Sequence, residues 1–169
     1  MRFRHLNIAL ALGIAAVILQ TTLFNRYLDP FGVAPNFVLL VVVAASYQLS
    51  EEAAMLLGFS AGLLTDLLGN TLLGVWALVL TVAGYTAVRI RPRVDGNAAL
   101  TLASIFALTI GGELLYAVLG TLFGQQVFSD VNAFKKVLLA AVYNLLLAAL
   151  VLPVTARLMR RDPATGVWT

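Results

Sequence analysis

Charged side chains are scarce in this sequence. Only 11% of its 169 residues are Asp, Glu, Lys or Arg, whereas 61% are hydrophobic. The mean hydropathy is +0.95. Soluble domains carry about 25% charged residues, so this chain has too few to cover a folded core with a water-compatible surface. A lipid bilayer accepts an apolar exterior, and we therefore expect an integral membrane protein.

Residues that carry chemistry are also scarce. There is no cysteine, which excludes disulfides and thiolate chemistry, and the one histidine is His5 in the basic N-terminal segment. A buried Ser–His pair or a His-based metal site therefore cannot be built, and no glycine-rich phosphate loop is present. We expect neither an enzyme nor a cofactor. The basic residues lie at the chain ends and in short gaps rather than in a patch, so nucleic-acid binding is not expected either.

Long apolar runs separated by short polar gaps predict an all-α membrane protein with six transmembrane helices. The expected spans are residues 6–24, 35–49, 51–68, 72–88, 98–123 and 134–158. Residues 1–169 then form a single integral membrane domain. We expect the first span to be retained, since no small-residue cleavage site follows it. Pro35 is expected to open the second span, and residues 89–97 form the clearest loop.

The basic residues predict the orientation. If both termini are cytoplasmic, eight of the eleven Lys and Arg residues lie inside and three outside. The inner eight are Arg2, Arg4, Arg89, Arg91, Arg93, Arg157, Arg160 and Arg161, and the outer three are Arg26, Lys135 and Lys136. The positive-inside rule favours this arrangement, which indicates a multi-pass protein of the bacterial cytoplasmic (inner) membrane.

The third expected span carries small residues and one carboxylate at intervals of four. Gly58, Gly62 and Asp66 therefore share one helix face, where small residues let another backbone approach closely. Asp66 is the only charge between residues 53 and 88, and a charge within a span is costly. We favour a structural role for it, stabilising the turn that begins at Gly69, over proton or ion handling.

Two further polar residues lie within expected spans. Glu113 follows Gly111 and Gly112, where a local bend is plausible. Either it is an interior carboxyl hydrogen-bonded to Asn144 or a nearby tyrosine, or it contacts a partner helix or substrate. Both interpretations of Glu113 stay open. Asn144 likewise either bonds Glu113 within the bundle or contacts another protein.

The segment Gly62-Leu-Leu-Thr-Asp66-Leu-Leu-Gly69, followed by Leu73-Gly74, resembles the signature of the rod shape-determining MreD family. The matched motif positions are Gly62, Asp66, Gly69 and Gly74. The resemblance implies a non-catalytic component of the machinery that elongates rod-shaped bacteria. It further implies binding to the membrane-anchored protein MreC, and association with MreB and the polymerase–transpeptidase pair that builds lateral peptidoglycan.

An alternative is the substrate-binding membrane subunit of an energy-coupling-factor vitamin transporter, to which the expected overall shape is similar. Ala11-Leu-Gly-Ile-Ala15 has the small-residue spacing with which such subunits dock on their partner. A vitamin pocket needs convergent polar and aromatic groups, and the outer loops offer few of them. The shape-determining interpretation is therefore preferred.

Overall fold

The computed structural model describes residues 2–24, 33–69, 72–125 and 133–159, and within these ranges the ordered elements are all helices. In chain order they are α1 (Arg2–Leu19), the π-helical turn η1 (Gln20–Phe24), α3 (Phe37–Ser46), α4 (Glu51–Leu68), α5 (Val75–Val94), α6 (Ala98–Leu122) and α7 (Ala133–Leu158). The all-α prediction is confirmed for the described part of the chain.

Three stretches are long and apolar enough to cross a membrane: His5–Leu23, Ala98–Leu122 and Phe134–Leu158. Helices α4 and α5 are 18 and 20 residues long, and each carries three charges near its ends. Helix α3 has only 10 residues, a rise of about 15 Å, which is half the thickness of a hydrocarbon core. The helices of the bundle therefore differ in how much of a membrane's thickness they can cross.

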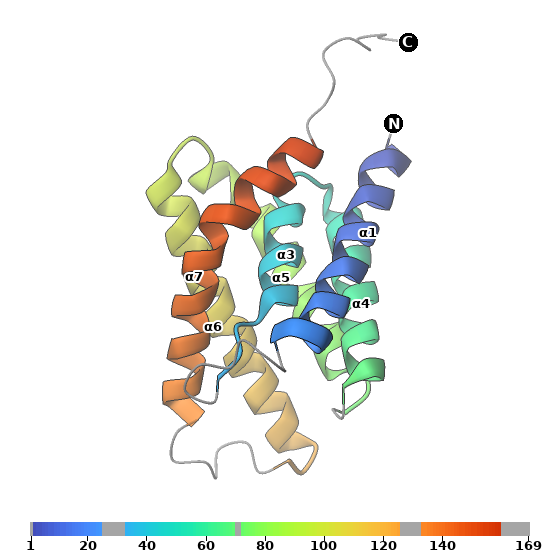
Figure 1. Cartoon of the computed structure of the whole chain (residues 1–169), viewed down its shortest axis with the longest axis vertical. Helices are drawn as coiled ribbons and strands as arrows, with labels where there is room; N and C mark the ends of the chain where they lie inside the picture. The colour runs from blue at the N-terminus through green and yellow to red at the C-terminus, as the bar shows by residue number, and fades with distance from the viewer. Residues whose placement is uncertain (1, 25–32, 70–71, 126–132, 160–169) are drawn as a thin grey trace, which may run out of the picture.

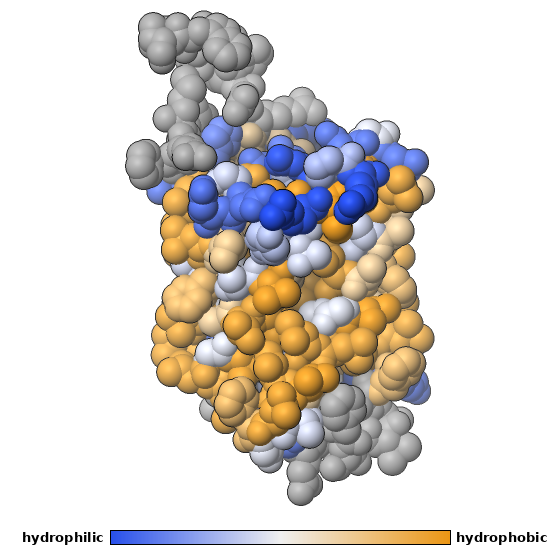
Figure 2. Space-filling model, turned by 180° about the vertical axis from the view of Figure 1, so that it is seen from behind, coloured by the Kyte–Doolittle hydropathy of each residue, from blue (hydrophilic) through white to orange (hydrophobic). Residues whose placement is uncertain are grey.

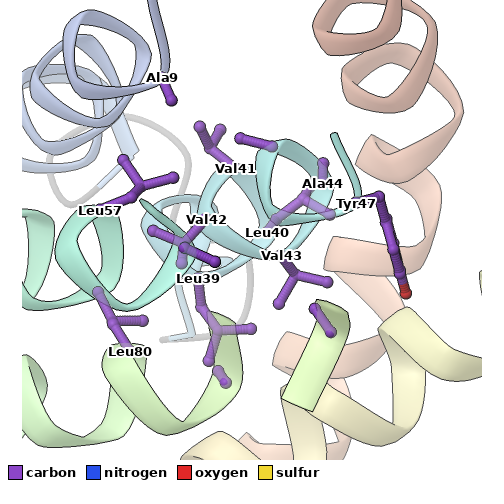
Figure 3. Close-up of a cluster of buried hydrophobic side chains, with 14 of the residues drawn as sticks. Ala9, Leu39, Leu40, Val41, Val42, Val43, Ala44, Tyr47, Leu57 and Leu80 are labelled. Carbon is purple, nitrogen blue, oxygen red and sulfur yellow. The ribbon is translucent and has the colours of Figure 1, made fainter. Parts of the chain in front are cut away.

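Helix α3 lies at the centre of the bundle. Every residue from Val38 to Ser46 is buried, and α1, α4, α5, α6 and α7 all contact it. Figure 3 shows side chains of α3 pointing toward Leu57 on α4, Leu80 on α5 and Ala9 on α1. A helix that is hydrophobic all round belongs inside a protein, which explains why the most apolar segment of the chain occupies this position.

The outer surface of the bundle carries a broad apolar belt. Large hydrophobic side chains are exposed on α1, α4, α5, α6 and α7, including Leu67, Leu122 and Leu146 at more than 60% exposure. Figure 2 shows a hydrophobic belt with hydrophilic residues gathered at one end. In water this surface would be unfavourable, so the fold indicates a membrane protein.

Arginines near the ends of several helices gather at one end of the bundle. Helix α1 begins, and α5 and α7 end, at the upper end of Figure 1, which we call the basic end. Arg91 and Arg93 lie in the last turn of α5, and Arg157 in the last turn of α7. The exposed Lys135 lies in the first turn of α7, at the opposite end.

The structure corrects two predicted helix limits. The second span does not begin at Pro35, because Asn36 is the N-cap of α3 and its side chain accepts a hydrogen bond from the Leu39 amide. The predicted loop at residues 89–97 is mostly helix, since α5 continues to Val94. Cations are favoured at a helix C-terminus, which stabilises this last turn although it contains Pro92.

The glycine pair in the fifth predicted span does not interrupt it. Helix α6 runs as one α-helix from Ala98 to Leu122. Gly112 is buried where a Cβ would meet the Leu39 side chain of α3, whereas a Cβ on Gly111 would meet nothing within 4 Å. Gly112 thus makes room for the central helix, while Gly111 lies on the outer side of α6.

Candidate functional site

The small-residue face of α4 lies directly against the backbone of α5. A Cβ added to Gly58 would come within 2.8 Å of the Thr81 Cα, and one added to Gly62 would overlap Ala77 and the Trp76 carbonyl. Gly84 on α5 mirrors this arrangement, because its Cβ would lie 2.9 Å from the Ala54 carbonyl oxygen. Backbone packs on backbone along this interface, and only glycine leaves enough space.

Asp66 lies at the end of the same face and accepts hydrogen bonds from the first amides of α5. Its Oδ2 is 2.9 Å from the Gly74 amide and 3.2 Å from the Ala77 amide, and its Oδ1 is 3.2 Å from the Trp76 amide. Its side chain is only 3% exposed. The carboxylate thus occupies the N-terminus of α5, where unpaired amides and the helix dipole favour a negative charge.

This geometry supports the structural interpretation of Asp66. Three of the amides that bond its carboxylate belong to the start of α5, 8 to 11 residues further along the chain.

The two motif glycines at the turn, Gly69 and Gly74, differ in whether another residue could adopt their backbone conformation. Gly74, the residue before α5, has φ +93° with no atom near its missing Cβ. Side chains are disfavoured in that left-handed region. Gly69 follows α4 with φ −92° and ψ 163°, a conformation open to any residue. Gly74 is therefore the position in this turn where the backbone conformation requires glycine.

A second polar cluster surrounds the start of α3. Gln20 in η1 donates through Nε2 to the Pro35 carbonyl at 3.0 Å and accepts from the Phe37 amide at 2.8 Å. Asn36 donates through Nδ2 to Glu113 Oε1 on α6 at 2.7 Å. The short central helix is thus held at its N-terminus by side chains from η1 and α6.

Glu113 and Asn144 are brought together, but Asn36 lies between them. Asn144 on α7 donates through Nδ2 to the Asn36 carbonyl at 2.9 Å and to Thr109 Oγ1 at 3.3 Å. The expected bond of Glu113 to Asn144 or to a tyrosine is replaced by the Asn36 bond. Asn144 is fully buried and bonds within its own bundle, which favours the internal interpretation over the partner-binding one.

A stacked aromatic pair lies between the polar groups around Asp66 and those at the start of α3. Trp76, whose amide bonds Asp66, stacks on Tyr116 of α6 with ring centroids 4.6 Å apart and planes at 18°. Tyr116 lies one turn of α6 beyond Glu113. The α4–α5 turn and the polar start of α3 are therefore joined through one stacked contact.

Gln20, Asn36 and Thr109 belong to the cluster at the start of α3 but were not predicted as site residues from the sequence. For Asn36 a local signal existed: an Asn directly before an apolar run is a preferred N-cap. For Gln20 and Thr109 the partners are distant in the chain, and no local pattern identifies them.

The basic end carries an ordered set of arginine contacts. Arg89 Nε lies 3.4 Å from Glu51 Oε1 and 2.9 Å from the Tyr85 hydroxyl; Arg89 is exposed, and Glu51 and Tyr85 are partly buried. Arg91 Nη1 instead donates to the carbonyls of Tyr47 and Leu49, at 3.1 and 3.3 Å, in the turn after α3. Arg89 therefore links α5 to α4, and Arg91 links α5 to the end of the central helix.

Among the described residues, no three His, Cys, Asp or Glu side chains converge on a possible metal position. The intramembrane carboxylates instead bond to amides and amide side chains that hold helix ends in place. The arrangement positions helices relative to one another.

Residues 2–161 match the family of the rod shape-determining protein MreD. The chain belongs to the MreD family. The match covers nearly the whole chain, so the resemblance found in the segment from Gly62 to Gly74 is confirmed. MreD is a shape-determining structural family and is not known as an enzyme family. No curated protein and no solved structure matches the chain. Membership assigns a role in rod-shape determination, and together with the apolar helices it indicates a membrane protein.

Proposed function

We propose that this MreD-family chain is a non-catalytic membrane component of the cell-elongation machinery and that it binds MreC. The observation that supports the proposal is that its intramembrane polar groups bond within the bundle. Asp66, Glu113 and Asn144 all bond to parts of their own bundle that begin or anchor helices. Such groups stabilise a fixed surface for other proteins to bind.

The partner would be recognised mainly within the membrane. The connections between described helices are short, and large apolar side chains cover the outside of the bundle. A single membrane-spanning helix, such as the anchor of MreC, packs against a surface of this kind through van der Waals contact. MreB and the polymerase–transpeptidase pair would then be gathered through the assembled complex.

A depletion experiment tests this function. In a rod-shaped host, loss of the protein is expected to produce round cells, and the tagged protein is expected to retain MreC in mild detergent. An unrelated polytopic membrane protein of similar size, carrying the same tag, is the control. Normal rods together with a growth requirement for an added vitamin would favour the vitamin-transporter alternative instead.

The orientation is part of the same proposal, with both termini in the cytoplasm. Because the chain lacks cysteine, single cysteines report accessibility without background. Asn25→Cys and Lys135→Cys are expected to react with an impermeant thiol reagent added to intact spheroplasts, and Asn97→Cys only after permeabilisation. Labelling of Asn97→Cys from outside would contradict the orientation.

A further inference from the structure

A pocket of about 510 Å³ opens at the basic end of the bundle. It lies where α3, α5 and α7 end and α6 begins, and its volume is in the range of small-ligand sites. Apolar walls come from Ala44, Val94 and Leu152, and polar groups from Tyr47, Gln48 and Thr101. Arg91 and Asp95 also line it, which places one positive and one negative charge in the same pocket.

The arginine in this pocket is fixed in position, and its charge is not neutralised within the bundle. Its Nη1 bonds two backbone carbonyls, and among the described residues Arg91 makes no ion pair. A guanidinium has five N–H donors, so donors remain for a ligand. A guanidinium pairs well with phosphate because its planar fork matches two phosphate oxygens.

Asp95, four residues after Arg91, lines the same pocket. The Asp95 amide donates to the Arg91 carbonyl at 2.9 Å, one helical turn back, while the Asp95 side chain is exposed and makes no ion pair within the described residues. A ligand with only negative charge would be attracted by Arg91 and repelled by Asp95. A ligand that carries a phosphate and an ammonium group a few bonds apart satisfies both.

The surroundings identify the source of such a ligand. The pocket lies at the basic end of the bundle, where α5 and α7 end and α6 begins. Leu100, beside the pocket-lining Thr101 at the start of α6, is 47% exposed, so acyl chains attached to the ligand would lie on an apolar flank. A lipid headgroup reaches a pocket at this depth without leaving the membrane.

We propose that this pocket binds the phosphoethanolamine headgroup of a phospholipid, with the phosphate on Arg91 and the primary ammonium on Asp95. Tyr47, Gln48 and Thr101 supply further polar contacts around the headgroup. A choline headgroup would bind less well, because its quaternary ammonium has no N–H to donate. A glycerol headgroup would bind less well, because it leaves Asp95 unpaired. This proposal does not depend on MreC binding.

The test measures the binding of short-chain phospholipids to the full-length protein, purified and delipidated in detergent. Dioctanoyl phosphatidylethanolamine, phosphatidylglycerol and phosphatidylcholine are titrated separately, with thermal shift and native mass spectrometry as readouts. Phosphatidylethanolamine is expected to bind about tenfold more tightly than the other two, a difference of about 1.4 kcal/mol. Equal binding of all three would overturn the proposal.

Substitutions assign the contacts. Asp95→Asn is expected to remove the preference for phosphatidylethanolamine over phosphatidylglycerol, because the repulsion of an anionic headgroup disappears. Arg91→Gln is expected to weaken all three lipids. Arg89→Gln is the matched control, because Arg89 lies two residues away, faces Glu51 and does not line the pocket. An unchanged preference in Asp95→Asn, whose exposed side chain is not needed for folding, would contradict the ammonium assignment even if Arg91→Gln failed to fold.

Soluble glycerophosphoethanolamine separates a lipid from a free metabolite. It carries the same charged groups without acyl chains, and we expect it to bind far more weakly than the lipid. Equal affinity for the two would contradict the lipid assignment and indicate a soluble ligand.

Discussion

The α4–α5 and α6–α7 pairs are both antiparallel helix pairs, yet they are built differently. Helices α4 and α5 meet through glycines, backbone against backbone, and their contact is the most extensive between any two elements. Helices α6 and α7 are longer, at 25 and 26 residues. They carry many of the most exposed large side chains, among them Leu122, Phe134 and Leu146.

The two pairs also use their polar residues differently. In α4–α5, Asp66 closes the turn of its own pair, within 11 residues of chain. In α6–α7, Glu113 and Asn144 bond to a residue outside their own pair, Asn36 at the start of the central helix α3, which is 77 and 108 residues away in the chain. The first pair is therefore stabilised within itself, and the second is fixed by the central helix. Variants in the first pair should accordingly cost more stability than variants in the second.

The largest effect is expected for Gly62→Leu. The new side chain would collide with the backbone of α5 at Trp76 and Ala77, and backbone cannot move aside as a side chain can. Overpacking typically costs about 1–3 kcal/mol, and occasionally more; this site should be at or above the upper limit. Thermal melting in detergent measures it. Gly111→Leu is the matched control, with open space at its Cβ; equal melting of the two variants would contradict the close packing.

Next comes Asp66→Leu, which leaves the amides of Gly74, Trp76 and Ala77 without their acceptor. Unpaired buried donors cost about 1–3 kcal/mol, so melting and MreC co-purification should both fall. Asp66→Asn retains one acceptor oxygen and should largely preserve both. If Asp66→Asn melts normally but abolishes rod shape, a proton- or ion-handling role replaces the structural one.

A smaller loss is expected for Gly74→Ala. The added Cβ has free space, so the cost is the left-handed backbone alone, about 1–2 kcal/mol. Gly69→Ala is the comparison within the same turn, and it should melt like the unmodified protein because its backbone is extended. A larger loss in Gly69→Ala than in Gly74→Ala would reverse the assignment of the strained position.

The smallest effects belong to the second pair. Glu113→Gln keeps an oxygen for Asn36 and should change stability by less than about 0.5 kcal/mol. Asn144→Val, closer to asparagine in volume than leucine is, should cost less than about 1 kcal/mol, since the Asn36 carbonyl still accepts from the Leu40 amide. Melting curves report the stability. A loss of MreC binding in Glu113→Gln without a change in melting would favour the partner-contact interpretation of Glu113.

The same contrast explains what the sequence predicted. The shared face of Gly58, Gly62 and Asp66 follows from a local period of four, which a helix imposes on neighbouring residues. The partner of Glu113 does not follow from any local pattern, because Asn36 is 77 residues away. Only the packing of α3 against α6 brings the two together.

The predicted loop at residues 89–97 was wrong for a related reason. Three arginines and a proline indicate a loop when they are read one at a time. In the fold, the arginines lie at a helix C-terminus, where their charge is favourable, and Arg91 also bonds the turn after α3. The first effect depends on where α5 ends, and the second on where that end lies relative to the turn after α3. The local sequence specifies neither.

The bond between Asp66 and the start of α5 has a consequence for biogenesis. During synthesis α4 emerges before the amides that neutralise its carboxylate exist, and an isolated α4 would carry an unpaired acid into lipid. The missing donors follow only 8 to 11 residues later, a delay of about one second at ordinary rates of translation. We therefore expect the translocon to release α4 and α5 into the bilayer together, as a preassembled hairpin.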